Sequence, residues 1–249
     1  MTIRHSRPPP RPRQLRRHLT LRRRVGGVVS SPPSPVKSPD HDHVYAEKIN
    51  QDPLYADYIL NELGFEKRSE HELFEHLSLS GAQSGMSWWD ILCRREAYRE
   101  AFHGFDIDKV ASMTKKDVEE LLCKKSEDGT KLVVRNRGKV ELVINNAKLI
   151  QQLKASGTIP SLSEYLWSFV DDKPILSRLQ TKSEMPTMTE ESERMSKELK
   201  KYGFKYVGPI TMYAMMQSCG LVMDYIVGSK HLADAEERLK KRLGGYQIR

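Results

Sequence analysis

The stretch SKELKKYGFKYVGPITMYAMMQ, residues 196–217, contains two helical segments separated by a turn that is bracketed by glycines. The first helix is expected to end at Lys201-Tyr202, because Gly203 follows and glycine readily adopts the conformation that closes a helix. Pro209 suits the first position of the next helix, where its missing N–H costs no hydrogen bond. The six residues 203–208 therefore predict a tight hairpin between two helices.

This hairpin has two interpretations. In a helix-hairpin-helix motif, the backbone N–H groups at the start of the second helix face outward and bind a DNA phosphate, directly or through a monovalent cation. The alternative is an ordinary corner between two helices. Lysines 197, 200, 201 and 205 surround the turn, and this local basic patch favours DNA. The expected DNA-binding residues of this region are Lys201, Gly203, Phe204, Lys205, Tyr206, Val207 and Gly208.

Composition and charge limit the classes of protein that fit. The chain has 249 residues, 38% of them hydrophobic, which is enough for one substantial core or two small ones. Its three cysteines lack the spacing of a disulfide framework or of a cysteine zinc site. No stretch approaches the roughly 20 apolar residues of a membrane span, so we expect a soluble protein with no membrane partner.

The net charge of +8 is concentrated at the N-terminus: residues 1–40 carry +9 and the remaining residues carry −1. Residues 1–44 are rich in arginine and proline and are expected to form a disordered extension. A transit peptide is the favoured interpretation, although the early prolines fit a helical presequence poorly. A basic nucleic-acid-binding or nuclear-targeting arm and a plain solvated tail are the alternatives. We therefore expect an intracellular protein, located in the mitochondrion, plastid or nucleus if this extension is a targeting segment. His41 and His43 lie at the edge of the extension, and we expect both side chains to be solvated.

Residues 45–232 have the pattern of an all-α domain with about eight to ten short helices. Thr114 with Asp117, and Ser161 or Ser163, are predicted helix caps. The strand-like stretch KLVVRNR, residues 131–137, is interpreted as a loop that enters a helix, and GLVMDYIV, residues 220–227, is assigned to the closing helical pattern. Residues 233–249 are expected to form a charged helix or tail.

A second informative stretch is LSLSGAQSGMSWWDILCRREAYREAF, residues 77–102, in which a glycine-containing turn leads into two tryptophans and an amphipathic helix. The tryptophans could simply fill a core, because each ring buries a large apolar area. Alternatively, ring faces beside a glycine-containing loop form a slot for a flat ligand such as a nucleobase.

These two stretches, together with QDPLYADYILNELGF, VVRNRGKVELVINNAK and YLWSFVDDKPI, resemble the DNA-3-methyladenine glycosylase I family in order and spacing, from about residue 48 to residue 230. The resemblance implies a helix-hairpin-helix DNA glycosylase fold with two helical lobes around a base pocket. It also implies hydrolytic release of alkylated purine, above all 3-methyladenine, during base-excision repair. Double-stranded DNA with alkylated bases is the implied partner, and we expect a monomer.

The resemblance also assigns roles to residues. Tyr58 and Trp88 correspond to the aromatic residues that sandwich or line the flipped base, Gln83 is in reach of the base edge, and Gly85-Met86 correspond to the loop inserted at the gap in the duplex. Asp224 lies 16 residues after Gly208, near the spacing at which related hairpin glycosylases carry a catalytic aspartate, with a structural role as the alternative.

The sequence departs from the family pattern at several positions. Ser80 stands where the family has a glutamate that reads the base, and Leu63 replaces a pocket tryptophan. The positions of the family's structural zinc ligands correspond to Ala46, Ile59, Tyr225 and Ser229, so we expect no zinc and no other cofactor.

The loss of the glutamate leaves two functions open. Ser80 and Asp224 are the remaining catalytic candidates of an active glycosylase, whose alkylated substrate is already a good cationic leaving group and needs little acid-base help. The alternative is a weak or inactive derivative that binds damaged DNA without cutting it.

Overall fold

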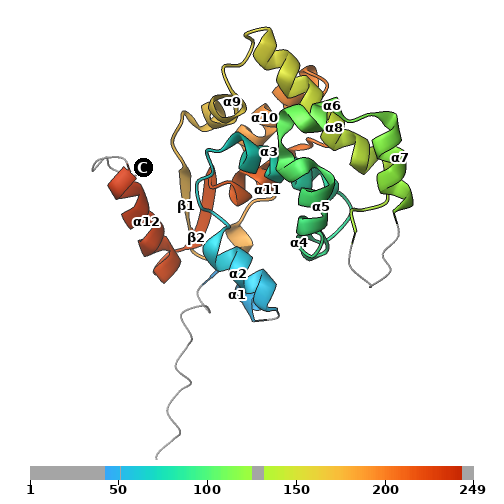
Figure 1. The fold of residues 1–249 in the computed structure, drawn as a ribbon. Coiled ribbons are helices and arrows are strands. Elements are labelled where there is room, and N and C mark those ends of the chain that lie inside the picture. The colour runs from blue at the N-terminus through green and yellow to red at the C-terminus, as the bar shows by residue number, and fades with distance from the viewer. Residues whose placement is uncertain (1–42, 51, 125–131, 243–249) are drawn as a thin grey trace, which may run out of the picture. The chain divides into compact units, whose positions relative to one another are not determined.

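The computed structural model describes residues 43–50, 52–124 and 132–242. The N-terminal extension up to residue 42, and with it the transit-peptide interpretation and the prediction for His41, lies outside these residues. Helices dominate the described part (Figure 1), and they confirm the all-α class. The α-helices are α1 (Ala46–Ile49), α2 (Pro53–Asn61), α3 (Glu70–Ala82), α4 (Trp88–Leu92), α5 (Arg95–Ala101), α6 (Ile107–Ser112), α7 (Lys115–Cys123), α8 (Arg137–Ala155), α9 (Leu162–Trp167), α10 (Glu190–Lys201), α11 (Pro209–Ser218) and α12 (Lys230–Arg242). The short 3-10 helices are η2 (His103–Phe105), η3 (Ser168–Val170) and η4 (Lys182–Glu184).

Local sequence signals set many of these helix ends. Thr114 and Asp117 form the predicted capping box at the start of α7. Ser161, rather than Ser163, caps α9 by accepting a hydrogen bond from the Glu164 N–H at 3.0 Å. The stretch 132–136 contains neither helix nor strand and leads into α8, as predicted for a helix-entry loop. The described part nevertheless contains twelve α-helices, more than the eight to ten expected.

A two-stranded parallel sheet was not predicted. Strand β1 (Ile175–Leu179) pairs with β2 (Val222–Ile226) in the register Leu176 to Met223. The helical assignment of residues 222–226 was therefore wrong. A short apolar run fits a buried strand or a buried helix equally well, and the partner strand lies more than 40 residues earlier in the chain.

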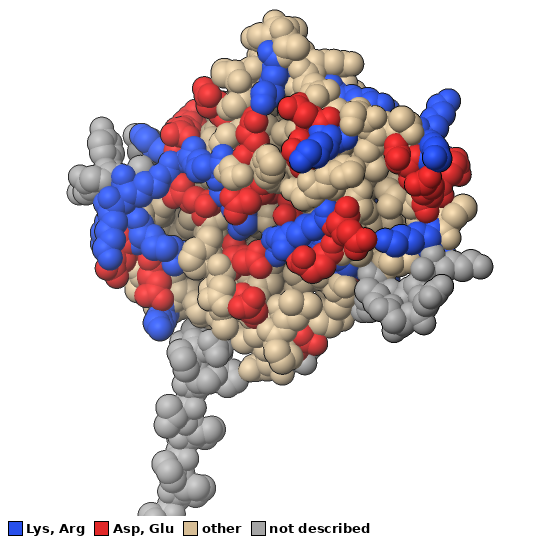
Figure 2. Space-filling model, viewed as in Figure 1, with Lys and Arg blue, Asp and Glu red and all other residues tan. Residues whose placement is uncertain are grey.

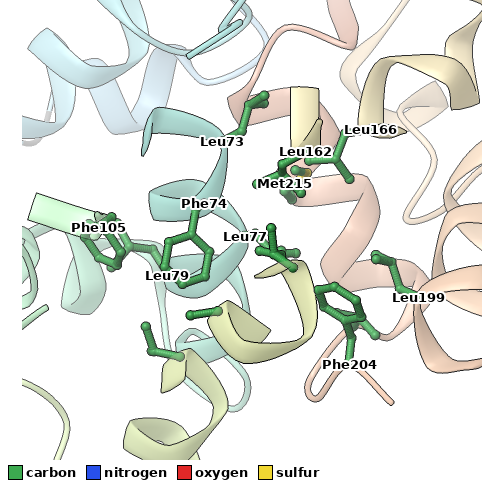
Figure 3. Packing of buried hydrophobic residues seen from close by; sticks show 14 of the residues in the cluster. Leu73, Phe74, Leu77, Leu79, Phe105, Leu162, Leu166, Leu199, Phe204 and Met215 are labelled. Carbon is green, nitrogen blue, oxygen red and sulfur yellow. The ribbon is translucent and has the colours of Figure 1, made fainter. Parts of the chain in front are cut away.

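Helix α3 is the centre of the core. Every residue from Leu73 to Ala82 is buried, so this helix is covered on all sides by the elements around it, which include α8, α9 and α11. Figure 3 shows Phe74 beside Phe105 and Leu77 on the side of Met215. Because the helix is fixed along its length, its last turn and the residues that follow are held in place for the site described below.

Helix α12 covers the outside of the small sheet. Leu232, Ala235 and Leu239 pack with residues of both strands, namely Leu176, Met223 and Tyr225. His43 joins this region: it is only 5% exposed, and its ring centroid lies 4.5 Å from that of His231 and 6.0 Å from that of Tyr225. The prediction that His43 is solvated was wrong, because two of the rings that cover it, those of Tyr225 and His231, come from a segment about 180 residues further along the chain.

Candidate active site

A cavity of about 260 Å³ lies where α1, α2, the end of α3, the start of α4 and the last turns of α11 meet. The structure brings four of the predicted site residues together there: Tyr58, Ser80, Gln83 and Trp88. The remaining lining residues are Tyr45, Lys48, Tyr55, Ile59, Leu63, Ser87, Ala214, Gln217 and Ser218. Apolar and aromatic walls with a few polar groups are typical of sites for small flat ligands.

The two predicted pocket aromatics, Tyr58 and Trp88, lie on the same side of the cavity rather than on opposite sides of the space for a base. The ring centroids of Tyr58 and Trp88 lie 5.3 Å apart at an interplanar angle of 43°. A base held between two rings needs about 7 Å, since each contact takes about 3.5 Å. The rings therefore line one side of the cavity and offer a continuous aromatic surface. Burial of Tyr58 raises the pKa of its hydroxyl well above the ordinary value, so the ring stays neutral.

The position of Trp88 follows from the turn before it. Gly85 adopts a left-handed conformation, with φ of +75°, and the Ser87 hydroxyl accepts the Asp90 N–H to start α4. Trp88 then packs between Tyr58 and the buried ring of His76, whose centroid lies 6.4 Å away at 20°. The neighbouring Trp89 is not among the residues that line the cavity, and it stacks on Tyr55 at 5.9 Å.

The cavity carries little negative charge. Ser80 is 2% exposed and occupies the last turn of α3. None of the described lining residues is a carboxylate, and Lys48 is the one charged side chain among them. Replacement of the expected glutamate by Ser80 therefore leaves the described lining of the cavity without a carboxylic acid, and Leu63 lines it in place of the expected tryptophan ring.

Asp224 is not brought to the cavity. It lies on β2 and is 7% exposed, and its Oδ2 accepts hydrogen bonds from the Tyr213 hydroxyl at 2.7 Å and from Gln217 Nε2 at 2.6 Å. Gln217 stands between Asp224 and the cavity that it lines. Asp224 therefore contacts a lining residue rather than the ligand space, which does not fit the direct catalytic role expected from its spacing.

Among the lining residues that sequence reasoning missed, Gln217 has the most distinctive contacts. It is a polar residue that follows the apolar run 213–216 near the end of α11, and this change from apolar to polar was the available signal. Nothing in the sequence shows that Asp224 hydrogen-bonds to Gln217, because this contact depends on the turn at Gly220 that brings β2 back beside α11. A Cβ at Gly220 would lie 2.5 Å from the backbone of Phe65, and its φ of +71° also favours glycine.

The predicted hairpin between α10 and α11 is present and tightly held. Phe204 and Val207 are buried, whereas Lys205 and Tyr206 are exposed. The Asn146 side chain brackets the tip, accepting from the Lys205 N–H at 3.0 Å and donating to the Lys205 carbonyl at 3.3 Å. Gly208 precedes Pro209 at the start of α11, as predicted.

The hairpin lies on the same side of the molecule as the turn before Trp88. A Cβ at Gly81 would lie 3.3 Å from Tyr206 Cβ, and a Cβ at Gly138 would lie 2.6 Å from the Tyr206 hydroxyl oxygen. Lys139, next to Gly138, donates from Nζ to the Ser84 carbonyl at 2.7 Å. The hairpin tip, the start of α8 and the turn that carries Gly85 and Met86 are therefore neighbours.

The positive charge around the hairpin is local. Lys201 is exposed and forms an ion pair with Glu198. On the face shown in Figure 2, basic and acidic side chains intermingle. The described part of the chain therefore presents individual lysines near the hairpin, and the large excess of arginine belongs to the N-terminal extension.

The residues at the family's zinc positions do not fit a zinc ion. Ala46 and Ile59 carry no donor atom, and the Ser229 hydroxyl accepts the Leu232 N–H at 3.1 Å. Tyr225 packs against histidine rings, and burial raises the pKa of its hydroxyl, which opposes the ionised form that would bind a metal. Across the described ranges, no group of three histidine, cysteine, aspartate or glutamate side chains is arranged to hold a metal. No helix in these ranges is long and apolar enough to cross a membrane.

Comparison with known proteins agrees with the geometry. A family model for methyladenine glycosylase matches residues 48–232. The DNA-3-methyladenine glycosylase 1 of Escherichia coli strain K12 is 43% identical over 180 residues, which cover 72% of this chain and 92% of that protein. The DNA-3-methyladenine glycosylase of Haemophilus influenzae is 39% identical over 178 residues, with 72% and 92% covered.

Solved structures match as well. A crystal structure of 3-methyladenine DNA glycosylase I superimposes with a TM-score of 0.67 at 40% identity, covering 72% of this chain and 94% of that one. A structure that describes 3-methyladenine recognition by the Staphylococcus aureus enzyme gives a TM-score of 0.69 at 29% identity, covering 78% and 97%. The expected fold is confirmed by these matches.

Proposed function

Since the chain belongs to the methyladenine glycosylase family, we propose that it is a base-excision repair glycosylase that hydrolytically releases alkylated purines, above all 3-methyladenine, from DNA. The observation that carries the proposal is the cavity with the Tyr58 and Trp88 wall, located near a hairpin suited to DNA phosphate. One surface thus combines a place for a base with a place for the backbone that carries it.

The hairpin would hold the DNA. The first N–H groups of α11 have no partner within the helix and lie at the positive end of its dipole, which suits a phosphate oxygen. The exposed Lys205 and Tyr206 at the tip add contacts to the backbone. Such contacts position the duplex without reading its sequence.

The turn at Gly85 and Met86 would enter the gap that forms when the nucleotide leaves the stack. Gly85 is exposed, and Met86 is half-buried against the core, so its position is supported. An inserted apolar side chain offsets the lost stacking between the neighbouring bases. The turned-out base then enters the cavity, as in other enzymes that act on bases.

Chemistry in this cavity depends on the state of the base. 3-Methyladenine in DNA carries a positive charge, and the neutral wall of Tyr58 and Trp88 attracts it through stacking and a cation–π interaction. Alkylation also makes the base a good leaving group, so the bond to the sugar breaks without a proton donor. Water then attacks the sugar carbon, giving the free base and an abasic site. Ser80 can hydrogen-bond the base but cannot serve as a charged partner.

We also propose that the protein acts as a monomer on double-stranded DNA, without zinc or another cofactor. The poor fit of Ala46, Ile59, Tyr225 and Ser229 to a metal supports the last point. A role in the mitochondrion, plastid or nucleus is proposed from the arginine-rich extension alone.

The experiment that tests the function is base release. The full chain is incubated with methylated duplex DNA, and the released bases are identified by chromatography while abasic sites are counted by alkaline cleavage. Release of 3-methyladenine with an equal number of abasic sites is expected. Binding to methylated DNA without release would instead identify a damaged-DNA-binding protein, which is the function that the acid-free cavity would otherwise favour.

A further inference from the structure

The side-chain amide of Gln217 is held in one orientation at the edge of the cavity. Its Nε2 lies 2.6 Å from Asp224 Oδ2 and 3.6 Å from the sulfur of Met185. The same Oδ2 accepts the Tyr213 hydroxyl at 2.7 Å, so it faces two donors. The backbone carbonyl of Gln217 also accepts the Gly64 N–H at 3.0 Å, which fixes the end of α11.

The identity of the atom that faces Asp224 follows from chemistry. A carboxylate oxygen that already accepts from a tyrosine hydroxyl can only accept again, so the amide must present its NH₂ group to it. The acceptors near that NH₂ group are Asp224 Oδ2, the Met185 sulfur and the Tyr45 hydroxyl oxygen. The amide oxygen Oε1 is then the polar atom that Gln217 offers to a ligand in the cavity.

A fixed acceptor distinguishes adenine from guanine. Adenine carries a donor, the exocyclic NH₂ group at C6, where guanine carries the acceptor O6. An acceptor held at this edge can bind the adenine amino group, whereas against guanine it faces a second acceptor, and both groups are then buried without a hydrogen bond.

We propose that Gln217 is a specificity-determining residue that reads the 6-amino group of the flipped base, and that Asp224 is the positioning residue that fixes its amide. The proposal rests on the proposed function and names the feature of the base that the site selects. It gives Asp224 a role in recognition in place of direct catalysis.

Gln83 is the competing candidate, since it also lines the cavity. Among the described residues, no hydrogen bond fixes its amide. A free amide can turn to present either its NH₂ group or its oxygen, so it can bind both purines. Gln217 is the better discriminator because its orientation is set before the base arrives.

The test is the ratio of two products. DNA that contains both 3-methyladenine and 3-methylguanine is digested by the full chain, and the initial release rates of the two bases are compared. The two bases carry the same methyl group at N3 but differ at C6. Gln217→Met, which keeps the side-chain length, should lower the adenine-to-guanine ratio about tenfold, the effect of one buried hydrogen bond. Asp224→Asn should lower it similarly, because the asparagine can donate to Oε1 and let the amide turn.

Two further variants separate orientation from general loosening. Tyr213→Phe removes a bond to Asp224 but keeps the carboxylate, so the ratio should stay within about twofold of the unmodified protein even if the melting temperature falls. Gln152→Met, on the exposed side of α8, is the matched glutamine control, and it should leave both rates unchanged.

Each result decides a different point. Three outcomes would overturn the inference while the glycosylase function stands. The adenine-to-guanine ratio is unchanged in folded Gln217→Met, or it falls as far in Tyr213→Phe as in Asp224→Asn, or it responds to Gln83→Met instead. Failure of the unmodified protein to release either base would overturn both. If Asp224→Asn does not fold, Gln217→Met decides alone, with its melting curve as the check on folding.

Discussion

Replacing Trp88 and Trp89 separately by alanine tests whether the cavity binds the base through its aromatic wall. The two residues are adjacent in the chain and chemically identical. Trp88 lines the cavity and contacts Tyr58, whereas Trp89 stacks on Tyr55 and is not a lining residue in the described structure. A difference between the two variants therefore measures the contact with the base rather than the loss of a tryptophan.

The expected magnitude combines two interactions. Stacking of one base on an aromatic side chain contributes about 1–3 kcal/mol, and a cation–π interaction adds about 0.5–2 kcal/mol for a positively charged base. Tyr58 remains in Trp88→Ala and keeps part of the wall, so a net loss of about 2–3 kcal/mol is expected. That loss corresponds to a fall of about 30- to 150-fold in kcat/KM for release of 3-methyladenine.

The assay is single-turnover release of 3-methyladenine from methylated duplex DNA, with a thermal melt of each variant. Trp88 is only partly buried, so its truncation should destabilise the fold by less than the roughly 3–5 kcal/mol typical of a fully buried tryptophan. Trp89→Ala should lower kcat/KM less than tenfold, through a loosened Tyr55. Equal losses in the two folded variants, or a loss below threefold in Trp88→Ala, would refute the aromatic-wall reasoning.

Three further predictions concern charge, pH and metal. Ser80→Glu should raise kcat/KM for cationic bases about tenfold, because a carboxylate about 5 Å from the base gains about 3 kcal/mol at an effective dielectric constant of 20, partly offset by its own desolvation; a lower rate in a folded variant would contradict this. Burial beside His231 lowers the pKa of His43 to about 4, so the folded state opposes protonation, and the free energy of unfolding should fall as the pH drops from about 6.5 toward 4. In His43→Phe, up to about 3 kcal/mol of this fall in the free energy of unfolding should disappear, as measured by denaturant titrations at several pH values. If the free energy of unfolding of His43→Phe falls with pH as steeply as that of the exposed-residue control His71→Gln, the prediction is wrong. Metal analysis should find no tightly bound zinc, and a chelator should leave the melting temperature unchanged; one bound equivalent would contradict the proposal.

The hairpin could be predicted from the sequence because its determinants are local. Gly203 closes one helix and Pro209 opens the next, and both act within a few residues of their own position. The capping box of Thr114 and Asp117 is equally local. The four predicted lining residues Tyr58, Ser80, Gln83 and Trp88 were supplied by the family resemblance, and the cavity then brought them together.

The contacts that the sequence did not reveal join distant segments. The strand at 222–226 exists because 175–179 pairs with it, and His43 is buried because Tyr225 and His231 cover it. Periodicity within one segment contains no information about which other segment will pack on it. The link from Asp224 to Gln217 is of the same kind, which is why the spacing of Asp224 suggested catalysis and the structure suggests positioning.

A cavity without a carboxylate among its described lining residues leaves most of the selectivity to bond cleavage. A pocket carboxylate would attract the cationic base and could also protonate a neutral one, which would endanger unmodified adenine. Without a carboxylate among the described lining residues, the preference of the site for the cationic base over normal adenine is limited to the cation–π interaction with the aromatic wall, about 0.5–2 kcal/mol, and Gln217 faces the same 6-amino group in both bases. Normal adenine is a poor leaving group that needs protonation, and none of the described lining residues is a carboxylic acid that could supply the proton. Discrimination against normal adenine should therefore lie mainly in kcat, so that undamaged DNA competes for the site without being cut.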